Sequence, residues 1–417
     1  MSGPFLELAR APVREPGGDG LIEVAYFPAF GHPGELADQY ARLLWYWSPL
    51  APHLGRISLA LEFEPPSRLD LPWYLDPGLL ERAGDLEGRV RLYRPGEGAA
   101  WERALARAEV VMLWDQGRAR PGHPVLVGKK VWRVDRRRER GEGTHYLMCA
   151  QEANPLSGQD LARSRESLGR MLAELGRWDK VYLFGTGPSL ELAMEREFGD
   201  GLTIACNSMV LNRPLMDRLA PRVICCADPV FHAGCSRYAG AFRSALVAEL
   251  GRRAAWLVVP FRDYHVYRRL LPESLRPRLV GVPLAHLGRV NLDLAERFAV
   301  QHAPNVLTLL LLPLAATLSR DQVLISGCDG RAPQGERYFW RHHRPSQLED
   351  EMASVRRAHP AFFEIDYQDY YQEHCRLLES WLQAGEARGL VFRNLTRSYI
   401  PALQKRSGPE TLQPTRC

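Results

Sequence analysis

The sequence lacks the features that would place it in a membrane or outside the cell. Its longest apolar run, residues 306–318, contains Pro313 and is shorter than the ~20 residues that span a bilayer. The first residues lack the basic-then-apolar pattern of a secretory signal. No two of the eight cysteines have the C-x-x-C spacing of zinc or redox sites. These absences predict a protein of the reducing cytoplasm with no transmembrane segment, and they leave peripheral membrane contact open.

Neither the charge nor the composition is extreme. The net charge is +5, from 54 basic and 49 acidic residues, and 46% of the residues are apolar, which is typical of globular proteins. One dense basic run, residues 133–140, is more typical of a solvated surface than of a nucleic-acid contact, so we expect no nucleic-acid partner. Repeats and low-complexity segments are missing. A chain of 417 residues is about two to three times the usual domain length, which predicts two domains.

Strand-like and helix-like segments alternate in the first part of the chain. Strands are expected at residues 21–27, 56–63, 89–93, 109–114 and 124–134, and helices at 35–47 and 99–108. This alternation is typical of a parallel sheet covered by helices. We therefore predict an α/β domain over residues 1–155.

The alternation restarts after a linking helix, predicted over residues 156–179 from a capping-box pattern at Ser157 and Asp160. Strands are then expected at residues 181–184, 202–206, 222–227, 254–260, 278–282, 322–326 and 389–394, and helices at 190–198, 292–300, after Asn305, and at 370–384. These elements predict a Rossmann-like nucleotide-binding domain over residues 180–402 and a loose tail over 403–417. The expected fold class is α/β, with two Rossmann-like domains and mostly parallel sheets.

Polar residues follow the predicted strands of the second half at the point where each strand ends. The carboxyl ends of such strands line the crevice in which doubly wound sheets bind ligands. A single polar residue there is commonly a helix cap or a turn, whereas several together favour a binding site. The residues are Gly185, Thr186, Gly187, Pro188 and Ser189 after the first strand, Asn207, Asp228 and Asp329 after later ones, and Asn394, Thr396 and Ser398 at the last.

The glycine loop after the first of these strands has chemistry of its own. Its two glycines let the backbone turn tightly and approach a ligand, and Ser189 can cap a helix that begins at Leu190. No lysine follows the loop, unlike in P-loop triphosphate sites, and Glu191 already complements the positive end of the helix. These features favour a nucleotide monophosphate ester as ligand. Mg²⁺ held by Asp228 and Asp329 would allow a triphosphate instead.

The stretch from residue 337 to residue 373 is rich in groups that transfer protons or hold phosphate. A long segment of this kind after a strand end is typical of an active-site lid, although a lone histidine is more often structural than catalytic. The groups are Tyr338, His342, His343, His359, Asp366 and Tyr370.

The order of these motifs resembles the bacterial sialyltransferases of glycosyltransferase family 42. It is also similar to their relatives, the motility-associated flagellin glycosyltransferases and the archaeal hydroxymethylpterin diphosphokinases. The motifs are GTGPSL, then IACNS, then ICCADP, then an apolar helix leading into LISGCDG, and the resemblance covers residues 180–400. It implies a GT-A/GT-B-like variant of the α/β fold that binds a sugar activated with cytidine monophosphate (CMP) and requires no metal or other cofactor.

The resemblance also implies roles for individual residues. Thr186, Asn207 and Asp228 stand at the positions of the family's nucleotide contacts, and Thr308 lies where the family has a Ser-Gly pair. Tyr338 matches the tyrosine that holds the leaving phosphate. His359 and Asp366 are the candidates for the general base, with His343 in reserve.

Three hypotheses of function follow. The first is a glycosyltransferase that moves a sugar from a nucleotide-activated donor to a surface-polysaccharide or glycolipid acceptor. The second is a pyrophosphokinase of the hydroxymethylpterin type, which would use ATP and Mg²⁺. The third is a non-catalytic nucleotide-binding protein, which would bind nucleotide without turning over a donor.

Overall fold

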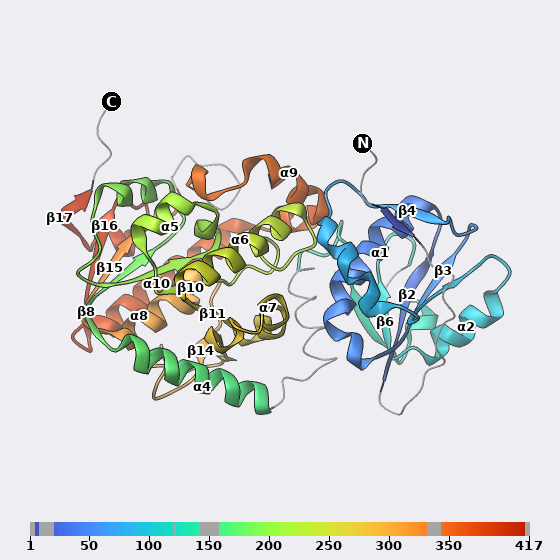
Figure 1. The fold of residues 1–417 in the computed structure, drawn as a ribbon, viewed down its shortest axis with the longest axis horizontal. Coiled ribbons are helices and arrows are strands. Elements are labelled where there is room, and N and C mark those ends of the chain that lie inside the picture. Colours follow the sequence, from blue (N-terminus) through green and yellow to red (C-terminus); the bar gives the residue numbers. More distant parts are fainter. Residues whose placement is uncertain (1–4, 8–20, 120–121, 142–157, 332–342, 413–417) are drawn as a thin grey trace. The chain divides into compact units, whose positions relative to one another are not determined.

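The computed structural model of the chain consists of two compact units (Figure 1). It describes residues 5–7, 21–119, 122–141, 158–331 and 343–412. Unit 1 comprises Met1–Leu156, Pro229–Gly240 and Glu351–Ile365, and unit 2 comprises Ser157–Asp228, Ala241–Asp350 and Asp366–Cys417. The sequence had placed all of residues 180–402 in one domain. Two segments of that range instead fold with unit 1.

Unit 1 is built on a five-stranded parallel sheet with the strand order β5-β3-β2-β6-β7. A two-stranded antiparallel sheet, β1 with β4, accompanies it. The sequence predicted a single strand over residues 124–134, but Pro124 starts a short 3-10 helix and only Lys130–Arg133 is extended. The elements are β1 (Phe5–Glu7), β2 (Ile22–Phe30), α1 (Pro33–Trp47), β3 (Leu54–Leu61), β4 (Arg68–Asp70), β5 (Val90–Tyr93), α2 (Gly98–Arg107), β6 (Val110–Leu113) and β7 (Lys130–Arg133), with 3-10 helices at Ser48–His53, Pro77–Leu86 and Pro124–Leu126.

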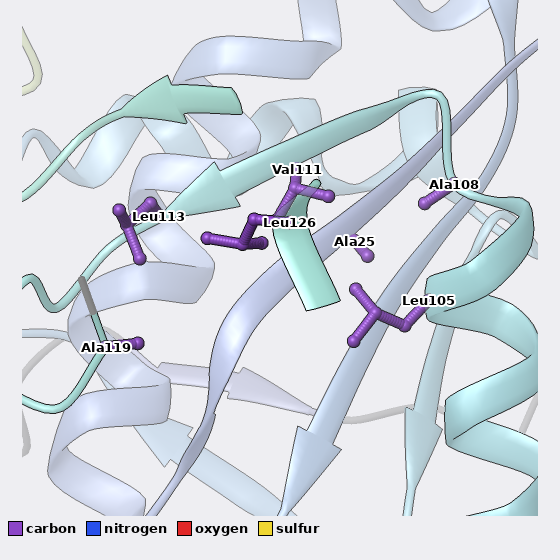
Figure 2. Close-up of a cluster of buried hydrophobic side chains, with 7 residues drawn as sticks. All are labelled: Ala25, Leu105, Ala108, Val111, Leu113, Ala119 and Leu126. Atoms are coloured by element: carbon purple, nitrogen blue, oxygen red, sulfur yellow. The ribbon is translucent and has the colours of Figure 1, made fainter. Parts of the chain in front are cut away.

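One part of the core of unit 1 lies between its sheet and α2 (Figure 2). Ala25 comes from β2, Val111 and Leu113 come from β6, and Leu105 comes from α2. Since both faces of a parallel sheet are covered, its strands carry apolar residues at successive positions, as all four residues of β6 do. The same cluster continues into the loop after β6 through Ala119 and Leu126.

A buried ion pair attaches one of the two distant segments to the rest of unit 1. The carboxylate of Asp38 in α1 lies 3.5 Å from Nε of Arg42 and 3.2 Å from Nε of Arg136, and it accepts a hydrogen bond from the Tyr74 hydroxyl at 2.6 Å. Burial alone would raise the pKa of Asp38, but the two arginines and the tyrosine hold it below its usual value. Arg42 and Arg136 also donate to backbone carbonyls of Ala358 and Arg357, so their charges bind the segment Glu351–Ile365.

Unit 2 is built on an eight-stranded, all-parallel sheet with the order β12-β11-β10-β9-β8-β15-β16-β17. Every residue of β9 and β11 is buried, as expected for strands covered on both faces. The strands are β8 (Trp178–Phe184), β9 (Leu202–Cys206), β10 (Val223–Cys225), β11 (Trp256–Pro260), β12 (Leu279–Val282), β15 (Ser319–Ser326), β16 (Val391–Thr396) and β17 (Ser407–Leu412), and β13 (Leu284–Ala285) pairs with β14 (Val300–Gln301) in a separate small parallel sheet.

Helices connect the strands of the large sheet. Besides the α-helices, 3-10 helices occur at Pro188–Glu195, Asn207–Leu211, Phe261–Asp263, Arg276–Arg278, Arg344–Ser346 and Pro360–Glu364, and a π-helix at Leu307–Leu311. The α-helices in this part of the chain are α4 (Gly158–Leu175), α5 (Arg213–Leu219), α6 (Arg237–Arg253), α7 (Tyr264–Leu270), α8 (Leu312–Leu318), α9 (Glu349–Ala358), α10 (Tyr367–Glu386) and α11 (Pro401–Gln404). No helix in the described part of the chain is long and apolar enough to cross a membrane.

The predicted α/β class with parallel sheets is confirmed, and several local predictions are wrong. The expected helix at 292–300 is absent, because Asn291 donates to the carbonyls of Arg297 and Ala299 and the Asp293 carboxylate accepts from Ala295 N–H. Such side-chain bonds compete with helical ones. The expected loose tail contains β17, which pairs with β16. Helices α5, α6, α7 and α9 were not predicted.

We expect Ala220→Gly to stabilise unit 2. Ala220 ends α5 with φ 42, a left-handed conformation that costs an alanine more than a glycine. After the larger backbone entropy of glycine is subtracted, the gain should be about 0.5–1 kcal/mol. Urea unfolding measures it.

Ala162→Gly is the matched control, because Ala162 lies exposed inside α4. There the same exchange should destabilise by about 0.5–1 kcal/mol. A loss of stability in both variants would contradict the left-handed cap.

Candidate functional site

The order of strands in unit 2 creates a switch point between β8 and β15. From β8 the chain adds β9, β10, β11 and β12 on one side, and later adds β15, β16 and β17 on the other. The connections that follow β8 and β15 therefore leave in opposite directions, which opens the crevice where doubly wound sheets bind ligands. The glycine loop at residues 185–189 follows β8, and residues 327–329 follow β15.

These two loops bind each other directly. Gly185 N donates to Ser326 O at 2.8 Å and Gly187 N donates to Gly327 O at 2.7 Å. A Cβ on Gly185 would lie 2.6 Å from Gly327 O, and Gly327 itself has φ 66, so both positions favour glycine. The predicted glycine turn is therefore required by packing as well as by any ligand.

The carboxylate of Asp329 lies at the start of the 3-10 helix Pro188–Glu195, which follows the glycine loop. Its carboxylate accepts from Ser189 N at 3.1 Å and from the Ser189 hydroxyl at 2.7 Å. Burial raises the pKa of Asp329, while the Ser189 bonds act in the opposite direction. The carboxylate thus takes the place at a helix start that commonly holds an anion.

The end of β16 supports the loop after β15. The Thr396 hydroxyl accepts from Gly327 N at 2.9 Å, and the Ser398 hydroxyl donates to Cys328 O at 2.7 Å. Asn394, expected at a strand end, lies inside β16, and its amide donates to Thr396 O and to the Ser407 hydroxyl. These three polar residues hold the backbone around Asp329.

Asn207 follows β9 next to the glycine loop. It has φ 49, a left-handed conformation that is uncommon for residues other than glycine. Its side-chain oxygen Oδ1 is buried and has no hydrogen-bond partner among the described residues. The preceding residue, Cys206, donates its thiol to Phe184 O at 3.2 Å, so the ends of β8 and β9 are in contact.

Two carboxylates and an arginine lie at the ends of β10 and β11. Asp228 follows β10, and Arg262 and Asp263 follow β11. Arg262 donates from Nε to Asp263 Oδ1 at 3.0 Å and from its guanidinium to Ala227 O at 3.3 Å. Burial raises the pKa of Asp263 to about 6, opposed by Arg262 and reinforced by Asp228. Arg262 and Asp263 were not predicted from the sequence, although they also follow a strand end.

The predicted catalytic residues fall in different places. His343 lies beside the glycine loop, since its N–H donates to Thr186 O at 2.8 Å, and its Nδ1 lies 2.9 Å from the Ser346 hydroxyl. Burial lowers the pKa of His343, which favours the neutral imidazole. Asp366 is exposed and caps α10 by accepting from Gln368 N at 2.8 Å.

His359 belongs to unit 1. It is buried, with Nε2 3.6 Å from Sγ of Cys235 and its ring edge-on to Trp45. Tyr338 and His342 lie outside the described residues. His343 is therefore the candidate base that the described structure places against the glycine loop.

The other predicted nucleotide contacts have local roles. Pro188 begins the 3-10 helix after the glycine loop. Thr308 is buried in the π-helix and donates to Asn305 O at 3.2 Å. Among the residues that the structure describes, no three metal-ligating side chains are grouped so that they could hold an ion.

The fold and the site define a doubly wound α/β unit whose polar strand ends meet at a switch point. No family model and no curated protein matches the chain. Part of it superposes on crystal structures of the sialyltransferase CST-II. One of these structures, a CST-II variant in complex with CMP, aligns with a TM-score of 0.30 and 13% sequence identity. The aligned region covers 52% of this chain and 80% of the CST-II chain.

A second CST-II structure, with CMP and a trisaccharide acceptor, has a TM-score of 0.31 and 12% identity, and covers 56% of this chain and 88% of the other. A further variant with CMP has a TM-score of 0.31 and 14% identity, with coverages of 54% and 87%. Superpositions of this quality assign no activity.

Gly187→Ala should destabilise unit 2 by about 1–3 kcal/mol, because overpacking forces the backbone to shift. A Cβ there would lie 2.1 Å from Asp329 Oδ2 and 2.8 Å from Gly327 O. Denaturant unfolding tests this. As a control, Gly199→Ala meets no atom within 4 Å and should change stability by less than about 0.5 kcal/mol. Equal stability of the two variants would contradict the contact between the loops.

The carboxyl of Asp263 should titrate near pH 6 in an NMR titration, as its burial implies. Because the folded state holds this proton above the ordinary pKa of 3.8, the contribution of Asp263 to stability falls as pH rises from about 4 to about 6. Asp263→Asn removes that contribution, so the difference in stability between wild type and variant should change across this window. A difference independent of pH would contradict the raised pKa.

Proposed function

We propose that the chain is a glycosyltransferase that takes a sugar from a nucleotide-activated donor of the CMP type and transfers it to a glycan or glycolipid acceptor. The observation that carries this proposal is Asn207, at the end of β9 beside the switch point. Its backbone is in the left-handed region and its buried Oδ1 has no hydrogen-bond partner among the described residues. Strained backbone conformations persist where the surroundings enforce them and often occur at ligand sites.

A nucleoside would donate the hydrogen bond that Oδ1 of Asn207 lacks. An unpaired buried acceptor costs about 1–3 kcal/mol, so a ligand that donates to it recovers this energy. The ribose hydroxyls and the exocyclic amine of cytosine are such donors. A nucleoside against Asn207, with Thr186 on one side and Asp228 on the other, follows the order of β8, β9 and β10 in the sheet.

The hydrogen bonds that the glycine loop already makes within the protein favour a donor with one phosphate. Three of its N–H groups, those of Gly185, Gly187 and Ser189, already donate to protein oxygens. The Asp329 carboxylate stands where an anion would be held. A triphosphate would meet a carboxylate and few unbound N–H groups there, which argues against the ATP-dependent pyrophosphokinase.

The proposed chemistry uses residues of unit 2. Tyr338 would donate a hydrogen bond to the leaving phosphate, which gains charge in the transition state. His343 would accept the acceptor hydroxyl's proton, because its lowered pKa keeps the imidazole neutral and its backbone joins it to the glycine loop. Asp366, at the start of α10 in unit 2, is the other candidate for the base.

The test compares nucleotides and two replacements of Asn207. In a thermal-shift assay CMP with EDTA should stabilise the wild type and ATP with Mg²⁺ should not, since only ligands of the folded state raise its stability. Asn207→Gly removes the amide but suits the left-handed backbone, so it should fold as well as the wild type and lose at least about tenfold in CMP affinity.

Asn207→Ala separates the two effects of this residue. It also removes the amide but keeps the backbone strain, so it should lose stability relative to Asn207→Gly by about 1 kcal/mol. Release of CMP from a CMP-activated sugar then distinguishes an enzyme from a binding protein. Undiminished CMP binding by Asn207→Gly, or stabilisation by ATP with Mg²⁺ alone, would overturn the proposal.

A further inference from the structure

Two histidines follow the strands of the small parallel sheet in unit 2. Leu284 pairs with Val300 and Ala285 pairs with Gln301. Continuing this register by one residue sets His286 beside His302, and residues paired in adjacent strands, about 4.8 Å apart, point to the same face. Both histidines are exposed.

The positive charge of Arg262 also acts on His302. It lowers the pKa of His302, as does that of His286, although burial has the largest effect. The guanidinium is fixed by its bonds to Asp263 and to Ala227 O. Three groups that carry or can carry positive charge therefore follow β11, β13 and β14, and the charges of Arg262 and His286 both act on His302.

The two imidazoles have no internal partner that would explain them. Within the described ranges, neither ring takes part in a hydrogen bond or an ion pair. When charged, two rings beside an arginine repel each other, and no carboxylate or carbonyl of the described residues is bonded to them. An oxyanion bound between them would remove this repulsion.

His286, His302 and Arg262 belong to the same unit as the proposed nucleotide site, and Arg262 connects to it through the end of β10. Ala227, which accepts from Arg262, directly precedes Asp228 at the end of β10. From β9, which carries Asn207, to β11, which carries Arg262, the sheet spans two strand spacings, or about 10 Å. The chain continues from His302 into the π-helix that contains Thr308.

We propose that His286, His302 and Arg262 form a subsite for a phosphate group, distinct from the glycine loop. Its relation to substrate rests on the proposed function; its affinity for phosphate does not. The phosphate belongs to the nucleotide of the donor or to a phosphorylated acceptor, and the chemistry of recognition is the same for both. Bidentate donation from the arginine and charge-assisted bonds from the histidines would hold it.

Binding at this subsite takes up a proton. The groups facing His302 are His286 and Arg262, and those facing Arg262 are Asp263, Asp228 and Tyr370. As the pH falls from 8 to 5.5, the imidazole of His302 gains charge and the carboxyl of Asp263 loses charge, so both changes strengthen the attraction for phosphate.

The experiment titrates the full chain with inorganic phosphate by calorimetry and follows the imidazole signals by NMR. Because the phosphate ion itself gains a proton between pH 8.0 and pH 5.5, the pH dependence is read against His302→Gln: between these pH values the wild type should gain about five- to tenfold in affinity relative to that variant, and the pKa of His302 should rise with phosphate. His302→Gln should lower the affinity at pH 5.5, and His286→Gln should weaken phosphate binding. His53→Gln, at a histidine of unit 1 with no hydrogen bond or ion pair in the described ranges, is the matched control and should behave as wild type.

The same pH dependence of phosphate affinity in the wild type and in His302→Gln, or unchanged binding in His302→Gln, would overturn the subsite. Asn207→Gly separates this outcome from failure of the proposed function, since it should keep phosphate binding while losing CMP. Competition between phosphate and nucleotides identifies the molecule to which the bound phosphate group belongs. Displacement of phosphate by CMP or by CDP assigns the subsite to a nucleotide phosphate, and retention of phosphate with both bound assigns it to the acceptor.

Discussion

The arrangement of unit 2 depends on the close approach of two loops at the switch point of its sheet. Gly185 and Gly187 donate to the backbone after β15, and side chains at these positions would collide with Gly327 and Asp329. Asp329 in turn accepts the N–H and hydroxyl of Ser189. Since β8 and β15 flank the switch point, this contact fixes where each neighbouring strand end can present a side chain.

The charge along the carboxyl edge changes with distance from this contact. Nearest to it lies the buried carboxylate of Asp329. Asn207 on β9 offers an amide, Asp228 on β10 a carboxylate, and β11 ends with the ion pair of Arg262 and Asp263. An extended ligand with a neutral nucleoside at one end and an anion at the other fits this order better than one whose charge is concentrated at the glycine loop.

The sequence predicts those parts of the site that follow from local pattern. An apolar strand that ends at a polar residue can be recognised in a short window, which is why Asn207, Asp228 and Asp329 were found at strand ends. The same rule would have found Arg262. A short stretch of sequence cannot reveal a contact between residues that lie far apart in the chain. Asn394 was expected at a strand end but lies within β16, where it bonds Ser407 of the unpredicted β17.

The two candidate histidines show the same limit in the assignment of chemistry. The family resemblance made His359 a candidate base together with Asp366, yet the segment of His359 is bound to unit 1 by Arg42 and Arg136, which both lie against the buried carboxylate of Asp38. There His359 packs against Trp45 and Cys235, as a core histidine does. His343 had been the reserve candidate because of its position in the chain. A backbone hydrogen bond to Thr186 sets it against the glycine loop, and burial keeps its ring neutral. A base must be neutral to accept a proton and must lie near the reacting group, so the argument for His343 rests on a contact that no sequence motif encodes.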